Sequence, residues 1–192
     1  GNIWSTIVDQ TYQGGAGVYN DYTGSYGMMS GTSMAAPHMS GLAAIVRQYV
    51  DANMVSLESK HDNAAIASKL LVSTAVPTAE DGVYVSPRRQ GAGIVNVAAA
   101  ITSPAYIDVE DKLVGKLELG DDVDWTGSYD LKFNVVNVSD KARTYSISAS
   151  ILRPDTAEQD GMTMVLEQVV LVKKVDLGKV TVPAKSTVEV SK

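Results

Sequence analysis

The hydrophobic and polar positions follow two different periods along the chain, and the change falls near residue 104. Before it, apolar residues recur every three or four positions, which is typical of helices with one buried face. This spacing predicts a helix from about Ser33 to Tyr49. Its buried stripe is made of Leu42, Ile45, Val46, Tyr49 and Val50. Gly41 lies inside this helix, where glycine costs about 1 kcal/mol relative to alanine. We therefore expect another element to pack closely against Gly41.

Capping residues predict two further helices. Asp62 can cap a helix that runs to about Thr74, and Asn96 can cap a shorter one. The inward face of the first of these is apolar, with Ile66, Leu70 and Leu71. Before Ser33, the glycine-rich stretch 10–25 predicts a loop between two short strands. Strands and helices together indicate an α/β layer domain over residues 1–104.

After about residue 105 the period becomes two. One side of the first alternating segment carries Tyr129, Leu131, Phe133 and Val135. The alternation returns after the polar turn 137–141, at Tyr145, Ile147, Ala149 and Ile151. Residues 165–172, 175–182 and 187–190 are further strand candidates. This pattern is typical of half-buried antiparallel strands. We expect residues 105–192 to form an all-β sandwich with its own core.

The segment with the most chemical information is residues 31–38, which read Gly-Thr-Ser-Met-Ala-Ala-Pro-His. Small residues flank Ser33, and a helical pattern begins directly behind it. A nucleophilic serine needs this arrangement, because a carbonyl carbon must reach its hydroxyl and its own N–H should face the developing oxyanion. Pro37 removes the helical hydrogen bond to the Ser33 carbonyl, a cost that natural sequences tend to carry at functional sites.

This octet resembles the catalytic-serine motif of the subtilases, the subtilisin-like serine proteases. Residues 26–30 are similar to the strand and loop that lead into that motif, and residues 1–6 to the strand before. Residues 91–100 resemble the turn and helix that close a subtilase domain. The resemblance covers residues 1 to about 103. It implies the C-terminal part of a subtilisin-like domain built on a parallel sheet, without cofactor or metal.

The resemblance also implies roles for three residues of the octet. Ser33 is the expected nucleophile of an endopeptidase that works by acyl transfer. Thr32 and Met34 are its expected neighbours at the oxyanion or substrate cleft. For Met28 and Met29, which precede the octet, ordinary packing is the preferred interpretation.

The other members of the catalytic triad are not found where the family has them. Subtilases keep the order Asp, His, Ser, and no histidine precedes Ser33. His38 is expected to pack or cap, and His61 to lie on the surface. Asn2 and Asn20 match neither the spacing nor the context of the family's oxyanion asparagine. The chain is therefore expected to be a piece of an enzyme that lacks the N-terminal part of its catalytic domain and is inactive alone.

Residues 105–192 resemble the fibronectin type III-like domain that follows the catalytic domain in large cell-envelope subtilases of the lactocepin and complement-cleaving types. This second resemblance depends on position after the protease and on phrases such as residues 180–187, not on a chemical motif. The alternative function, of a different class, is a non-catalytic adhesion or scaffolding segment of a cell-surface protein. Asp and His motifs encoded upstream of Gly1 would favour the protease.

Composition restricts the partners. The formal charge of −6 argues against nucleic acid or an anionic membrane, and no apolar run has the length of a membrane span. There is no cysteine, so neither a disulfide nor a thiolate metal site is possible. These features agree with a secreted or cell-envelope-attached protein of a bacterium, Gram-positive by the resemblance, that acts on protein or peptide substrates.

Three weaker signals have simpler interpretations. Gly91-Ala92-Gly93 lacks the third glycine of a dinucleotide loop. Asp121, Asp122 and Asp124 are not followed by the glycine and distal glutamate of a calcium loop, so a solvated acidic turn is favoured. Asn137-Val138-Ser139 fits the glycosylation pattern, but a turn at the end of a strand is the better interpretation.

Overall fold

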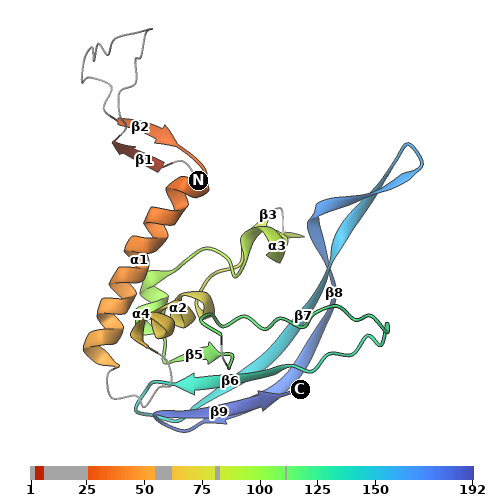
Figure 1. The fold of residues 1–192 in the computed structure, drawn as a ribbon. Coiled ribbons are helices and arrows are strands. Elements are labelled where there is room, and N and C mark those ends of the chain that lie inside the picture. Colours follow the sequence, from red (N-terminus) through yellow and green to blue (C-terminus); the bar gives the residue numbers. More distant parts are fainter. Residues whose placement is uncertain (1–2, 7–25, 55–61, 81–82, 111) are drawn as a thin grey trace, which may run out of the picture. The chain divides into compact units, whose positions relative to one another are not determined.

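The computed structural model describes residues 3–6, 26–54, 62–80, 83–110 and 112–192 (Figure 1). The contacts between residues divide the chain into two units, residues 1–44 and 45–192, which are described separately. The helices are α1 (Thr32–Asn53), α2 (Asn63–Ser73), α3 (Pro87–Gln90) and α4 (Val97–Thr102). The strands are β1 (Ile3–Thr6), β2 (Tyr26–Met29), β3 (Ala79–Glu80), β4 (Val83–Tyr84), β5 (Ala105–Asp108), β6 (Lys132–Asn137), β7 (Arg143–Gln159), β8 (Met162–Val182) and β9 (Ser186–Ser191).

The first unit contains β1, β2 and the beginning of α1. The two strands pair antiparallel, with Ile3 opposite Met29 and Thr6 opposite Tyr26. The prediction of two short strands is confirmed, while the predicted loop 10–25 lies outside the described residues. Every strand pair among the described residues is antiparallel, so the parallel sheet implied by the resemblance is not part of what this structure shows.

Helix α1 is confirmed and is longer than predicted, since it ends at Asn53 and not near Tyr49. Val46 and Val50 of the predicted stripe are completely buried, but Ile45 is half exposed and was wrongly assigned to the stripe's buried side. The expectation for Gly41 is not met within its own unit. Apart from Gly41 itself, its chain neighbours and the backbone of its own helix, no described atom of this unit lies within 4 Å of the place where its Cβ would be.

The capping predictions for the next two helices are confirmed. The Asp62 side chain accepts a hydrogen bond of 2.7 Å from the Ala65 N–H at the start of α2. The Asn96 side chain accepts one of 2.9 Å from the Ala99 N–H at the start of α4. Each satisfies one of the N–H groups that a helix leaves unpaired at its first turn. The predicted inward residues of α2 are all buried: Ile66, Leu70 and Leu71.

Between α2 and α4 the chain forms elements that the periodicity did not predict. These are the short hairpin β3–β4 and the single-turn helix α3, which has Ser86 as its N-cap. Behind α3, the backbone at Ile94 pairs with Val76. Gly93 has a φ of 122°, and a Cβ there would lie 2.2 Å from the Val76 carbonyl oxygen. The Gly-Ala-Gly segment thus serves close backbone packing.

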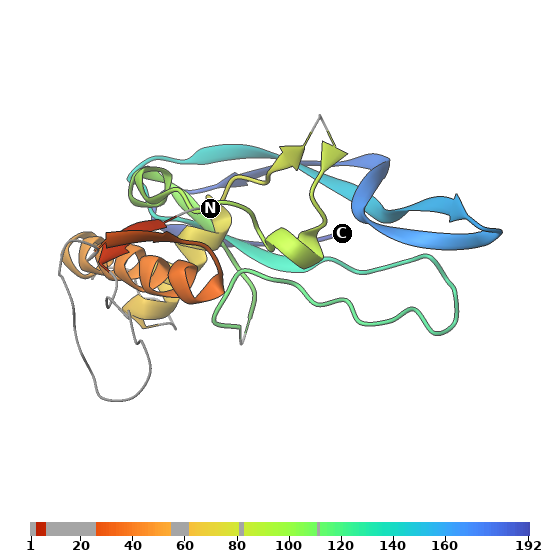
Figure 2. The same cartoon turned by 90° about the horizontal axis from the view of Figure 1, so that it is seen from above.

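The alternating half of the chain forms two antiparallel sheets. One has the strand order β5–β6–β9, and the other is the long hairpin β7–β8 (Figure 2). Val135, Val182 and Val190 form the buried centre. The partly buried residues around it are Ala105, Phe133, Tyr145, Ile147, Val180 and Val188. The predicted alternation is confirmed at Tyr145, Ile147 and Ala149, which are half buried between exposed neighbours.

Three strand predictions need correction. Strand β6 begins at Lys132, so Tyr129 precedes it and is exposed. Ile151 is exposed by 49%, and the regular β7–β8 register is interrupted directly after it. The segments 165–172 and 175–182 are parts of one strand, β8. The chain is thus an α/β part followed by antiparallel β structure, and the fibronectin type III-like sandwich stays a prediction.

Several contacts in the second unit cross residue 104. The Lys69 Nζ of α2 donates a hydrogen bond to the Asp108 carboxylate of β5 in a buried ion pair. The Ile107 N–H donates to the Ser73 hydroxyl over 2.9 Å. The domain division into 1–104 and 105–192 rests on the change of period and stays a prediction.

Candidate active site

Ser33 lies in the first turn of α1. The turn closes through the Gly31 carbonyl, which accepts hydrogen bonds of 3.1 Å from the N–H groups of Met34 and Ala35. Gly31 has a φ of 146°, a conformation that favours glycine. Ser33 is exposed, and its N–H belongs to the helix start, where N–H groups have no acceptor within the helix. This is the arrangement that the octet predicted for a reachable hydroxyl beside an anion-attracting N–H.

The last two residues of the octet, Pro37 and His38, lie in the next turn of α1. Pro37 lies inside the helix and has no N–H to donate to the Ser33 carbonyl. One residue later, His38 is exposed, and its Nδ1 donates a hydrogen bond of 2.8 Å to the Met34 carbonyl. The ring thus bonds a carbonyl inside its own helix, so it neither caps the helix nor packs in a core as was expected for His38. It is not hydrogen-bonded to Ser33.

The expected neighbours of Ser33 lie on the same turn. Thr32 is the first residue of α1 and is exposed. Met34 is half buried, with its sulfur 3.9 Å from the place where a Cβ of Gly31 would be. Met28 and Met29 of β2 are exposed by 58% and 49%, so the packing interpretation of these two residues is wrong within this chain.

No base contacts the serine in the part of the chain that the structure describes. Among those residues, none forms a hydrogen bond with the Ser33 hydroxyl. Nor do those residues contain a group of three or more His, Asp or Glu side chains that could hold a metal ion. His61 lies outside the described residues. The described site therefore presents an exposed serine hydroxyl beside the N–H groups of a helix start.

The two discounted polar signals each have a structural explanation. The Asp122 carboxylate accepts hydrogen bonds from the Gly127 N–H (2.6 Å) and from the Thr126 N–H (3.0 Å). These two backbone bonds hold the pKa of Asp122 below its ordinary value. The Asn137 amide is buried and donates to the carbonyls of Lys141, Val182 and Pro183. The acidic turn and the strand-end turn are both confirmed.

Comparison with known proteins identifies the segment around Ser33. The matched segment is residues 5–93, which contain the complete octet, and its family is the subtilase family. This part of the chain belongs to the subtilase family. The match confirms the resemblance inferred from the octet and supports a serine-type peptidase in general.

Individual relatives extend the subtilase match into the β structure. The chain is 29% identical to a C5a peptidase of Streptococcus pyogenes over 168 residues, which cover 86% of this chain and 14% of that protein. It is 36% identical to PII-type proteinases of Lacticaseibacillus paracasei and Lactococcus lactis subsp. cremoris over 110 residues, which cover 53% of this chain and 5% of each relative. The chain thus spans only about one-seventh of the length of the C5a peptidase. None of the described helices is both long and apolar enough to cross a membrane.

Proposed function

We propose that this chain is the nucleophile-bearing part of a serine endopeptidase that cleaves proteins or peptides by acyl transfer through Ser33. The observation that carries the proposal is the position of Ser33. It is exposed in the first turn of α1, within the segment that belongs to the subtilase family. Relatives with the names peptidase and proteinase support the same class of reaction.

In the proposed reaction, the Ser33 hydroxyl attacks the peptide carbonyl and forms an acyl-enzyme, which water then hydrolyses. A histidine from the preceding part of the domain takes the hydroxyl proton and passes it to the leaving amine, and an aspartate orients that histidine. The Ser33 N–H stabilises the oxyanion together with an asparagine from the preceding part. The Thr32 hydroxyl is a further donor candidate, and Met34 borders the cleft.

Because the proposed base comes from the preceding part of the domain, we expect the 192-residue chain alone to be inactive as a peptidase. Without a base, a serine hydroxyl is a poor nucleophile at neutral pH. In subtilisin, loss of the triad histidine lowers turnover by about 10⁶, nearly as much as loss of the complete triad. The partner required for activity is therefore the missing N-terminal part of the catalytic domain. By the same resemblance, we place the parent protein outside a Gram-positive cell, secreted or attached to its envelope.

The test compares this chain with a longer protein, in which the polypeptide encoded directly before Gly1 is joined to it. A fluorophosphonate probe should label Ser33 in the longer protein only, and casein cleavage should disappear in Ser33→Ala. Thr6→Ala is the matched control for a lost hydroxyl outside the octet. Labelling of Ser33 in the isolated chain would show that the base lies within it. A longer protein without labelling would favour the adhesion or scaffolding alternative.

A further inference from the structure

The outer half of the β7–β8 hairpin, residues 152–171, has an unusual form, and we refer to it as the hairpin arm. It consists of two strands only, and both views show it projecting beyond the three-stranded sheet of the second unit (Figures 1 and 2). Its tip is well defined. Asp160 and Gly161 have φ values of 53° and 75°, which are typical of a tight two-residue turn. Beside the tip, the Thr163 hydroxyl donates to the Glu158 carboxylate over 2.7 Å.

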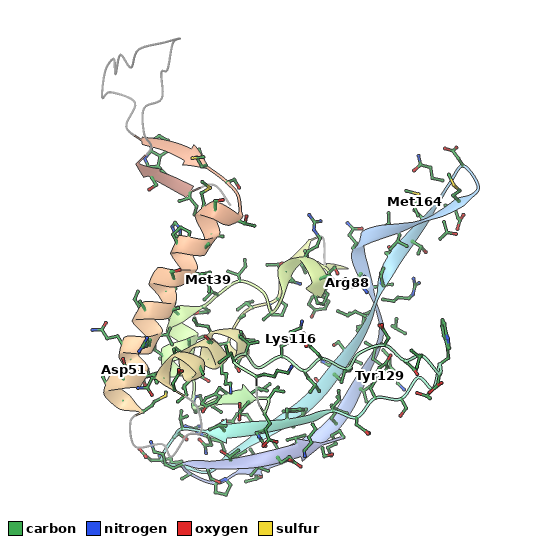
Figure 3. The ribbon with its side chains drawn as sticks, viewed as in Figure 1. Met39, Asp51, Arg88, Lys116, Tyr129 and Met164 are labelled. Atoms are coloured by element: carbon green, nitrogen blue, oxygen red, sulfur yellow. The ribbon has the colours of Figure 1, made fainter. Side chains whose placement is uncertain are left out.

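The hairpin arm exposes large apolar side chains. Met162 and Val165 are exposed by 63% and 69%, and Met164 by 46%. Figure 3 shows Met164 near the tip of the hairpin arm. Leu166 and Leu171 are also exposed. An isolated two-stranded hairpin is at best marginally stable in water. Contiguous exposed apolar residues on such an element mark an interaction surface. The arm therefore has the form of a docking element whose partner is not among the described residues.

One contact of the arm shows which partner fits. Gln168 of β8 forms an antiparallel bridge with Val85, directly after β4. Strand β4 and Val85 lie within residues 5–93, the segment that belongs to the subtilase family. The arm thus already lies against a piece of the subtilase domain, although it comes from the β structure that follows this domain.

We propose that the hairpin arm docks against the rest of the subtilase domain and extends the interface that begins at Val85. This inference rests on the proposed function, because the occupant is the same preceding part that supplies the base. The matched region is only 14% of a C5a peptidase, so such a relative contains much sequence outside this region. The hairpin arm contains four acidic residues, Asp155, Glu158, Asp160 and Glu167, and one basic residue, Arg153. The surface that receives the arm is therefore apolar with a basic rim.

Methionine oxidation tests the docking without any use of activity. Peroxide converts an accessible methionine to its sulfoxide, and burial slows the reaction. In the isolated chain, Met162 and Met164 should be oxidised rapidly. In the longer protein they should react about ten-fold more slowly, by mass spectrometry of their peptides. Met54, which is 5% exposed, is the internal control and should react slowly in both proteins. Equal rates for Met162 and Met164 in the two proteins would overturn the proposal.

A charge at the docking surface gives a second readout. Met162→Lys combined with Met164→Lys should lower the melting temperature of the longer protein and leave that of the isolated chain unchanged. Ser148→Lys, at an exposed position on the inner half of β7, is the matched control and should change neither. An equal effect in both proteins would assign the methionines to local folding and refute docking. Labelling of Ser33 without protection of the arm refutes only the docking, and protection without labelling refutes only the catalytic proposal.

Discussion

Two glycines of this chain differ in what surrounds them. Gly93 has a positive φ, and the Val76 carbonyl occupies the space of a Cβ. Gly41 lies within helix α1 and has open space around it in this chain. The sequence alone suggested close packing at Gly41 and only a turn at Gly93. The requirement for glycine depends on neighbours distant in sequence, so it cannot be inferred from local spacing.

Substitution of these glycines by alanine should therefore have opposite effects. Gly93→Ala should destabilise the chain by about 3 kcal/mol or more, because backbone atoms must move and φ is unfavourable for alanine. Gly41→Ala should stabilise it by up to about 1 kcal/mol through helix propensity. Urea unfolding followed by circular dichroism measures both. If Gly41→Ala destabilises the longer protein instead, the close neighbour predicted for Gly41 is supplied by the preceding part.

The Asp122 turn should respond to acid. The pKa of Asp122 is lowered in the folded chain, so its contribution is fully present above the unfolded pKa of about 3.9 and is lost as the pH falls through the folded value. The turn should therefore be constant from about pH 8 to pH 5 and open only below about pH 4. Trp125, which lies inside this turn, reports the change by fluorescence in a Trp4→Phe background. In Asp122→Ala the acid transition should be absent, and its persistence would assign the transition to another group.

At the scale of elements, short-range contacts could be predicted from the sequence, whereas long-range contacts could not. Asp62 and Asn96 cap their helices through bonds to a residue three positions ahead, and such short spacing can be predicted. Lys69 lies on the apolar side of α2 and bonds a residue 39 positions away, which no local pattern reveals. The β8 strand was divided in two, although Asp160-Gly161 is a strong hairpin signal that could have indicated its true beginning.

The Lys69–Asp108 pair gives a prediction for the packing of α2 on β5. Lys69→Met should destabilise the chain by about 3–5 kcal/mol, because it leaves the Asp108 carboxylate buried without this cation. Lys69→Met combined with Asp108→Leu should cost less than either single change, since no buried charge remains. The free energies of unfolding in urea complete the double-mutant cycle. Lys132→Met, which breaks the exposed ion pair with Glu189, is the control and should cost less than about 1 kcal/mol.

At the scale of the whole molecule, the change of period predicted the transition from helices to antiparallel strands correctly. The serine motif likewise predicted the family correctly, because eight contiguous residues carry it. Which helices and strands pack together in one unit could not be predicted from the sequence. In the structure, residues 45–192 form one unit in which α2 contacts β5 and Val85 pairs with β8. Each of these contacts joins a residue before residue 104 to a residue after it, and no local sequence pattern indicates such a pair.

A fragment of residues 105–192 should therefore fold with a lower melting temperature than residues 45–192. It keeps the core of Val135, Val182 and Val190 but loses the Lys69 and Ser73 contacts to β5. Thermal unfolding followed by circular dichroism measures the difference. Equal melting temperatures would show that the β structure is independent of α2. A fragment without cooperative unfolding would show that residues 105–192 are not a domain.

The buried amide of Asn137 has a consequence for how the protein can be produced. Its nitrogen donates to three carbonyls, while its oxygen accepts from the N–H and hydroxyl of Ser139, the third residue of the glycosylation pattern. A sugar on that nitrogen is incompatible with these bonds. Secretion through a eukaryotic cell, where glycans are added before folding is complete, would attach one where the folded chain has no room. Bacterial expression avoids this modification and leaves the turn between β6 and β7 free to form.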